Sequence, residues 1–284
     1  MKYYMKRLAA TCILLFLVSN AGITAPDIPI TIKTSIDWNT QKIIVQARLN
    51  MQRAGFKIPA GRTDAELYMK TQLPLLCRDT VLSVAFDSYR TILDTLNDQT
   101  IRAADIEAYM SSWTQVASSL STDLTYLNME ITYDLIKLAS LYIKHTKALD
   151  LPVTLDYEPT RNYSGILIYA KGYYPVQGEF ETGKLEPSLF PRIYDESMQL
   201  ILERNYVNPE ILRNSGICGW AQDINSPDIV LRTGQDPLRI LAYKVFGTKR
   251  SDIIITKQDA LKILLNENNR KLIENGKVVI VYGK

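Results

Sequence analysis

The chain has 284 residues, of which 46% are apolar, with 33 Lys and Arg against 30 Asp and Glu. Three of the basic residues lie in the first seven positions, so the rest of the chain carries equal numbers of acidic and basic side chains. Binding to a nucleic-acid backbone needs a basic face. The balanced charge therefore argues against a nucleic-acid partner, while the apolar content suffices for one large core or two small ones.

The first 21 residues have the pattern of an export signal. A basic start is followed by an apolar run over residues 8–18 and by the small residues Ser19-Asn20-Ala21. We expect cleavage of this signal peptide, residues 1–21, so that the mature chain begins near Gly22, with cleavage after Ala25 as an alternative. A retained anchor is disfavoured because the run is shorter than the ~20 residues that span a bilayer. Cys12 lies inside the run, which favours a place in the signal over lipidation.

In the front half the pattern predicts two strands and several helices. Apolar residues alternate in residues 41–50 and again in residues 127–135, which predicts two strands with one buried face each. Between them, Thr63 with Glu66 suggests a helix cap, and we expect a long helix through residues 65–96, kinked or split at Pro74. A second helix is expected over residues 106–120, and a short one over residues 136–148.

The back half is richer in strands. We expect strands at the following places: ILIYAK at 166–171, a hairpin of 191–195 and 198–205, residues 239–247, residues 251–256, and the closing 277–283, with a helix over residues 258–268. The link EPTRN at 158–162 is the expected domain boundary. The sequence thus predicts an α/β (α+β) protein of two small lobes, each a mixed or antiparallel sheet packed with helices. Their expected ranges are 26–158 and 163–284.

Motifs for catalysis are sparse. His145 is the single histidine of the chain, and no HExxH, GxSxG or Walker-type loop occurs. We expect His145, beside two lysines, to face solvent. Glu179 and Glu181 lie on one side of an extended segment, but solvated loop acids explain them better than an acid and base pair. We therefore predict no enzyme, no catalytic residue, no metal and no cofactor.

Two further sets of residues have structural interpretations. Asp195 and Glu196 are expected to form a turn, because aspartate readily accepts hydrogen bonds from the backbone just downstream. Cys77 and Cys218 suit either a disulfide in an oxidising compartment or two buried free thiols, and the sequence leaves both open.

Several motifs resemble a family of exported envelope proteins. IIVQARLN with RTDAELYMKTQLPLL resembles the strand and long helix shared by small outer-envelope lipoproteins and the flagellar accessory proteins FlgP and FlgT, the latter in its N-terminal domain. YSGILIYAKG with LEPSLFPRIYDES is similar to a motif of exported relatives of that group, although Tyr169 replaces the usual acid. The resemblance implies a non-enzymatic part of an envelope or flagellar assembly in the periplasm, with outer-membrane association as an alternative.

The segment Tyr173–Lys184 interrupts the family-like pattern. It places Tyr173, Tyr174 and Phe180 beside a proline and two glycines, a mixture suited to docking a partner by aromatic contact, with simple loop packing as the alternative. We therefore predict a structural or interaction component that binds envelope or flagellar proteins. The competing functions are a periplasmic glycan hydrolase and a small-ligand binding protein.

Overall fold

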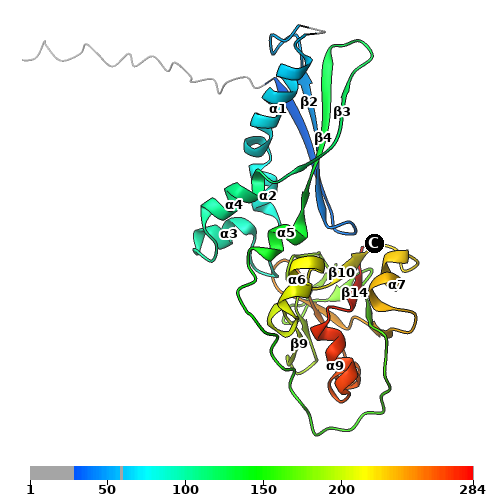
Figure 1. The fold of residues 1–284 in the computed structure, drawn as a ribbon. Helices are drawn as coiled ribbons and strands as arrows, with labels where there is room; N and C mark the ends of the chain where they lie inside the picture. Colours follow the sequence, from blue (N-terminus) through cyan, green and yellow to red (C-terminus); the bar gives the residue numbers. More distant parts are fainter. Residues whose placement is uncertain (1–28, 58–59, 284) are drawn as a thin grey trace, which may run out of the picture.

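The protein folds into two α+β domains, which lie one above the other in Figure 1. The computed structural model describes residues 29–57 and 60–283. The predicted fold class is confirmed, because each domain has sheets packed with helices. The predicted signal peptide, with Cys12, lies outside the described residues.

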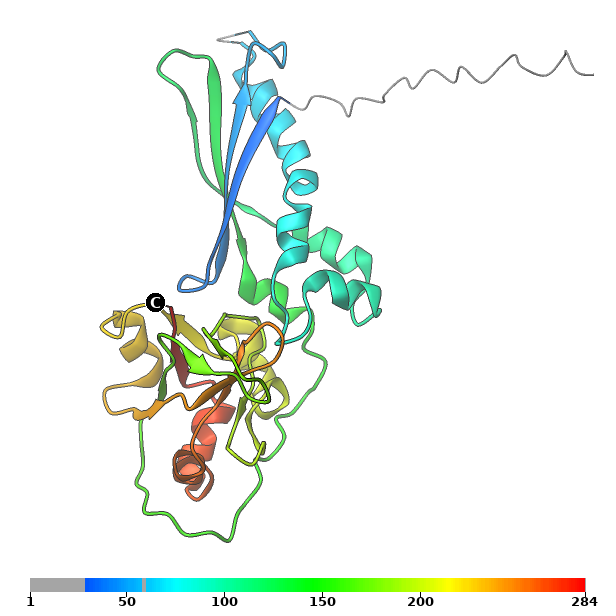
Figure 2. The ribbon, with the colours of Figure 1, turned by 180° about the vertical axis from the view of Figure 1, so that it is seen from behind.

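The N-terminal domain is built on a four-stranded antiparallel sheet in the order β1-β2-β4-β3. Its strands are β1 (Ile30–Asp37), β2 (Lys42–Asn50), β3 (Thr114–Leu120) and β4 (Tyr126–Asp134). The alternation predicted for β2 and β4 is confirmed, since their apolar residues are buried on one face. Helix α1 (Arg62–Leu76) packs on that face of the sheet (Figure 2). The opposite face carries mainly polar residues.

The long helix predicted for this domain is split close to Pro74, as expected, but a second break was not predicted. It is divided into α1, α2 (Arg78–Ser83) and α3 (Ile92–Asn97), with a non-helical loop at residues 84–91. Pro74 lies within the last turn of α1, and the chain leaves the helix after Leu76. Thr63 is not the cap, because α1 starts at Arg62 after Gly61. The capping box instead joins Thr91 and Asp94 at the start of α3.

Two other helices are shorter than predicted. The second helix, α4 (Ala103–Met110), ends before residues 114–120, which form the edge strand β3. Val116 is exposed there, so the helical spacing was misleading, and pairing with β4 decided the structure. Helix α5 (Leu135–Ser140) stops well short of residue 148.

The C-terminal domain contains two four-stranded sheets. A parallel sheet has the order β10 (Gly219–Ala221), β14 (Val278–Val281), β5 (Ile166–Tyr169) and β11 (Leu238–Leu241). A mixed sheet has the order β12 (Lys244–Phe246), β13 (Asp252–Ile254), β8 (Ile193–Tyr194) and β9 (Leu200–Leu202). The helical elements are the 3-10 turn η1 (Arg204–Tyr206), α6 (Pro209–Ser215), α7 (Pro227–Thr233), α8 (Lys257–Leu264) and α9 (Glu267–Glu274).

Most strands predicted for this half are confirmed, including the β8–β9 hairpin. Asp195 forms the turn as expected, because its carboxylate accepts the backbone N–H groups of Ser197 and Gln199. The strand predicted over residues 239–247 is instead two strands in different sheets. The helix predicted over residues 258–268 ends at Leu264, and Asn266 caps a separate helix, α9.

Residues 141–165 connect the domains without a helix or strand and run along the outside of the C-terminal domain (Figures 1 and 2). The predicted boundary at 158–162 lies in this segment. Asn269 holds it in place by donating to the Arg161 carbonyl at 2.8 Å. Within the described residues, no helix is both long and apolar enough to cross a membrane.

Candidate functional site

The segment predicted as a docking loop is a small hairpin of β6 (Tyr174–Pro175) and β7 (Thr182–Gly183). Phe180 at its tip is fully exposed, at 112% of the reference area, and Tyr173 is 69% exposed. The Lys184 ammonium lies 4.6 Å from the centroid of the Tyr173 ring. Tyr174 is different: it is half-buried against the C-terminal core. The structure therefore displays two of the three predicted aromatic residues.

Several contacts pin this hairpin to the domain. The Val176 side chain is buried, and the Gln177 N–H donates to the Val245 carbonyl at 2.9 Å. Arg250 forms ion pairs of 3.1 Å with both Glu179 and Glu181. A Cβ at Gly183 would lie 2.4 Å from the Arg250 Cδ, so a larger residue here would displace the Arg250 side chain. The hairpin is thus a fixed display of its exposed rings.

These contacts also give Glu179 and Glu181 a structural role. Sequence analysis placed both acids on one side of an extended segment, and the structure brings them to a single guanidinium. Sharing one cation ties the β7 side of the hairpin turn to Arg250. The pair therefore holds the loop that carries Phe180.

The expectation that His145 faces solvent is wrong. Its ring is half-buried, and its Nε2 lies 3.0 Å from the Val207 carbonyl oxygen. Cys77 and Cys218 are free, buried thiols, so the alternative of a disulfide does not hold. Burial raises the pKa of Cys77 to about 11 and that of Cys218 to about 12. Neither thiol is a reactive thiolate at neutral pH.

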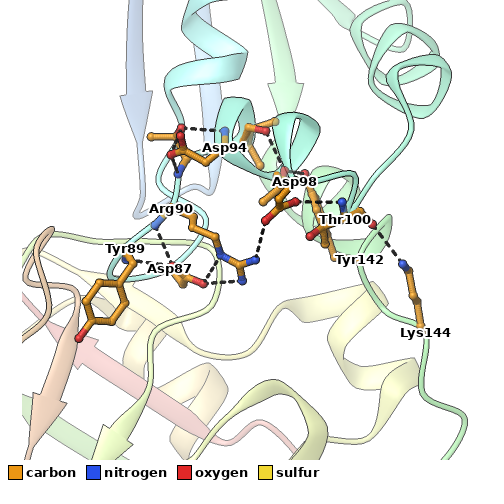
Figure 3. Close-up of polar contacts among 11 residues, drawn as sticks. Asp87, Tyr89, Arg90, Asp94, Asp98, Thr100, Tyr142 and Lys144 are labelled. Carbon is orange, nitrogen blue, oxygen red and sulfur yellow. Dashed lines mark hydrogen bonds and ion pairs between the residues drawn. The ribbon is translucent and has the colours of Figure 1, made fainter.

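A polar loop at residues 84–91 lies where the two domains meet (Figure 3). Its centre is Asp87, whose buried carboxylate accepts the backbone N–H groups of Tyr89 and Arg90 at 2.9 Å each. The Arg90 guanidinium donates to Asp87 at 2.8 and 3.0 Å and reaches Asp98 at 3.2 Å. The loop is therefore held rigid by its own side chains.

This loop bonds directly to the C-terminal domain. The N–H groups of Leu189 and Phe190 donate to the Ala85 and Phe86 carbonyls at 3.0 and 2.9 Å. The rings of Phe86 and Phe190 pack with centroids 5.1 Å apart, and Tyr142 lies against both. Leu189 and Phe190 thereby join the core of the N-terminal domain. Backbone hydrogen bonds and a shared core join the two domains.

A second contact involves Ser88 and a buried acid. The Ser88 hydroxyl donates to the Phe246 carbonyl at 3.2 Å and lies 3.1 Å from the Ser251 hydroxyl. Next to it, Asp252 is 1% exposed, and its Oδ1 accepts the Arg192 N–H at 2.9 Å. Its Oδ2 has no hydrogen-bond partner among the described residues. Burial, with a smaller effect of Asp87, raises the pKa of Asp252 to about 6 against the pull of Ser88 and Arg192.

Sequence reasoning missed this acid. The signal was an aspartate at the start of the apolar run DIII, where each neighbouring position is buried. A charged residue in such a run needs a partner or a raised pKa. Among the described residues, no cluster of three or more His, Cys, Asp or Glu side chains could hold a metal ion.

Asp252 makes the stability of the protein depend on pH in a specific way. Because its pKa is higher in the folded chain than the ordinary value of 3.8, the fold loses stability as the pH rises from about 4 to about 6. A shift of this size corresponds to about 3 kcal/mol. As the pH rises from about 4 to about 8, the unfolding free energy of Asp252→Asn should therefore fall less than that of the native protein.

Urea unfolding at a series of pH values measures this difference. Asp64→Asn, at an exposed position of α1, serves as the control and should follow the native profile. An Asp252→Asn profile parallel to the native one would show that the buried carboxylate does not govern the pH dependence.

Two regions of the chain match family models that describe domains of one protein. Residues 29–141 match the N-terminal domain of Treponema pallidum Tp0624, and residues 165–284 match its second domain. No curated protein matches the chain. Neither model description mentions FlgP or FlgT, so that resemblance stays a prediction. The chain is thus similar, over most of its length, to two domains of Treponema pallidum Tp0624 in the same order.

Proposed function

We propose that the protein is a non-enzymatic interaction component of the cell envelope, which uses the β6–β7 hairpin to bind a protein partner. The observation that carries this proposal is the exposure of Phe180 and Tyr173 on a hairpin that Arg250 and Val176 hold in place. A fully exposed phenylalanine contributes nothing to the core of its own domain. Buried at an interface, such a ring becomes a strong anchor.

The rigidity of the hairpin supports binding as much as its chemistry does. A flexible loop loses conformational entropy when a partner orders it, and that loss weakens the complex. The ion pairs of Arg250 and the Gln177 to Val245 hydrogen bond fix the hairpin before any partner arrives. The partner then meets a preformed aromatic surface.

The setting of this function follows from the sequence. The predicted signal peptide implies export to the periplasm, and the resemblance to FlgP and FlgT makes a flagellar accessory role the specific form of the proposal. The partner on this account is another envelope or flagellar protein. Glycan hydrolysis receives less support, because Glu179 and Glu181 are held by Arg250 on the hairpin.

Replacing both exposed rings tests the docking role. Tyr173→Ser with Phe180→Ser should change the unfolding free energy by less than about 0.5 kcal/mol, since both side chains are mainly in solvent. Binding to the partner should weaken by tenfold or more, because the loss of an aromatic anchor typically costs about 2 kcal/mol. Thermal melting and binding to the partner, isolated with the native protein from envelope extracts, measure the two effects.

Tyr157→Ser is the matched control, because Tyr157 is 87% exposed in the segment that connects the domains. This variant should bind the partner as the native protein does. Native affinity in the Tyr173 and Phe180 double variant, or an equal loss in Tyr157→Ser, would refute the hairpin as the docking surface.

Export has its own test. The protein isolated from its native cells should begin near Gly22 and should fractionate with periplasmic proteins, because the signal peptide is removed during translocation. N-terminal sequencing measures this directly. An intact Met1 in the native protein would refute export by this signal, and a lipidated Cys12 would show anchoring instead.

A further inference from the structure

A cleft of about 430 Å³ opens between the domains on the side of the β1–β2 hairpin turn. The N-terminal domain contributes Asn39 and Gln41 to it, and the C-terminal domain contributes residues from α6, α7, β10 and the start of β14. Gln41 fixes one wall by donating to the Cys218 carbonyl at 3.0 Å. The volume suits a small organic molecule.

The walls of the cleft are largely apolar and rigid. They include Ile211, Trp220, Ile229, Leu231 and Val279. The Trp220 ring is held between the edges of Trp38 and Tyr282, at centroid distances of 6.2 and 5.6 Å. Leu231, by contrast, is 82% exposed and leaves an apolar side chain uncovered at the cleft. An apolar part of a ligand would cover it.

The charged groups at the cleft are two cations, Arg232 and Lys277, and one acid, Asp228. Arg232 donates to the carbonyls of Ser215, Gly216 and Gly276 at 2.7 to 2.9 Å, yet no carboxylate lies within ion-pair distance of it in the described chain. These bonds use three of the five N–H donors of the guanidinium. Lys277 is exposed at the same cleft, and Asp228 is the one acid among the lining residues.

We propose that this cleft binds a small monocarboxylate with an apolar chain. The carboxylate would lie between Lys277 and Arg232, with the Asn39 and Asn275 amides as further donors, and the chain would cover Leu231 and Trp220. The cations have no carboxylate partner among the described residues and lie beside apolar walls. Such a cleft suits an amphipathic anion better than a neutral or cationic molecule. This site is separate from the β6–β7 hairpin and does not depend on the proposed docking function.

Hexanoate and 1-hexanol form a matched pair of probes, because they differ in charge and share the alkyl chain. Calorimetry, together with the tryptophan fluorescence to which Trp220 at the cleft contributes, should show hexanoate binding at least tenfold more tightly than hexanol, as expected for a charge-assisted hydrogen bond. N-acetyl-leucine is a third probe, which distinguishes a fatty-acid-like ligand from the C-terminus of a peptide. Tighter binding of hexanoate assigns a fatty-acid-like ligand, and tighter binding of N-acetyl-leucine assigns the C-terminus of a peptide.

Variants that change the charge of the cleft test where the carboxylate of hexanoate lies. Lys277→Gln should weaken hexanoate binding about three- to fivefold, and Asp228→Asn should strengthen it, because the two changes alter the charge of the cleft in opposite directions. Both side chains are exposed, so folding should be retained. Lys33→Gln, at an exposed position on β1, is the control and should bind as the native protein does.

Three results would overturn the proposal: no saturable binding of either carboxylate in the millimolar range, equal binding of hexanol and hexanoate, or native affinity in Lys277→Gln. The Tyr173→Ser and Phe180→Ser double variant should keep native hexanoate affinity. If this double variant loses its protein partner but keeps its hexanoate affinity, the docking proposal and the cleft proposal are tested separately.

Discussion

The close contact between residues 84–91 and the C-terminal domain is the constraint on which the rest of the structure depends. Gly247 lies at a φ of +88°, and a Cβ there would come within 2.3 Å of the Ser88 Cβ. Glycine is therefore required both for the backbone conformation and for the approach of the loop. With the backbone bonds of Leu189 and Phe190 to the loop, this contact lets one domain complete the core of the other.

The short strand β12 transmits this constraint to the proposed docking surface. On one side, its Phe246 carbonyl accepts the Ser88 hydroxyl of the N-terminal domain. On the other side, its Val245 pairs with Val176 at the base of the β6–β7 hairpin. The cleft depends on the same docking, because Asn39 and Gln41 line it from the N-terminal domain and Trp38 packs against Trp220. The cleft thus requires the two domains to stay in one arrangement, and the base of the hairpin adjoins the strand that contacts the N-terminal domain.

The sequence correctly predicted those elements whose structure depends mainly on neighbouring residues in the chain. Strands β2 and β4 alternate cleanly because one face of their sheet is buried, and the turn at Asp195 follows from its own side chain. The break at residues 84–91 was not predicted, because besides the local bonds of Asp87 the loop is fixed by Leu189 and Phe190, far along the chain. Residues Trp113 to Leu120 kept a helical spacing that the ladder with β4 overrode. The hairpin aromatics were predicted from composition, but the burial of Tyr174 and of Asp252 depends on tertiary contacts.

The central claim is that the two domains form one rigid unit, and the distance between them in solution tests it most directly. Spin labels at Leu67→Cys in α1 and Leu241→Cys in β11 would occupy exposed positions, while the buried Cys77 and Cys218 stay unlabelled. A chain that begins at Gly22 lacks Cys12. Double electron–electron resonance should give one narrow distance distribution. A broad distribution, or two distances, would contradict the account, because the domains would then move independently.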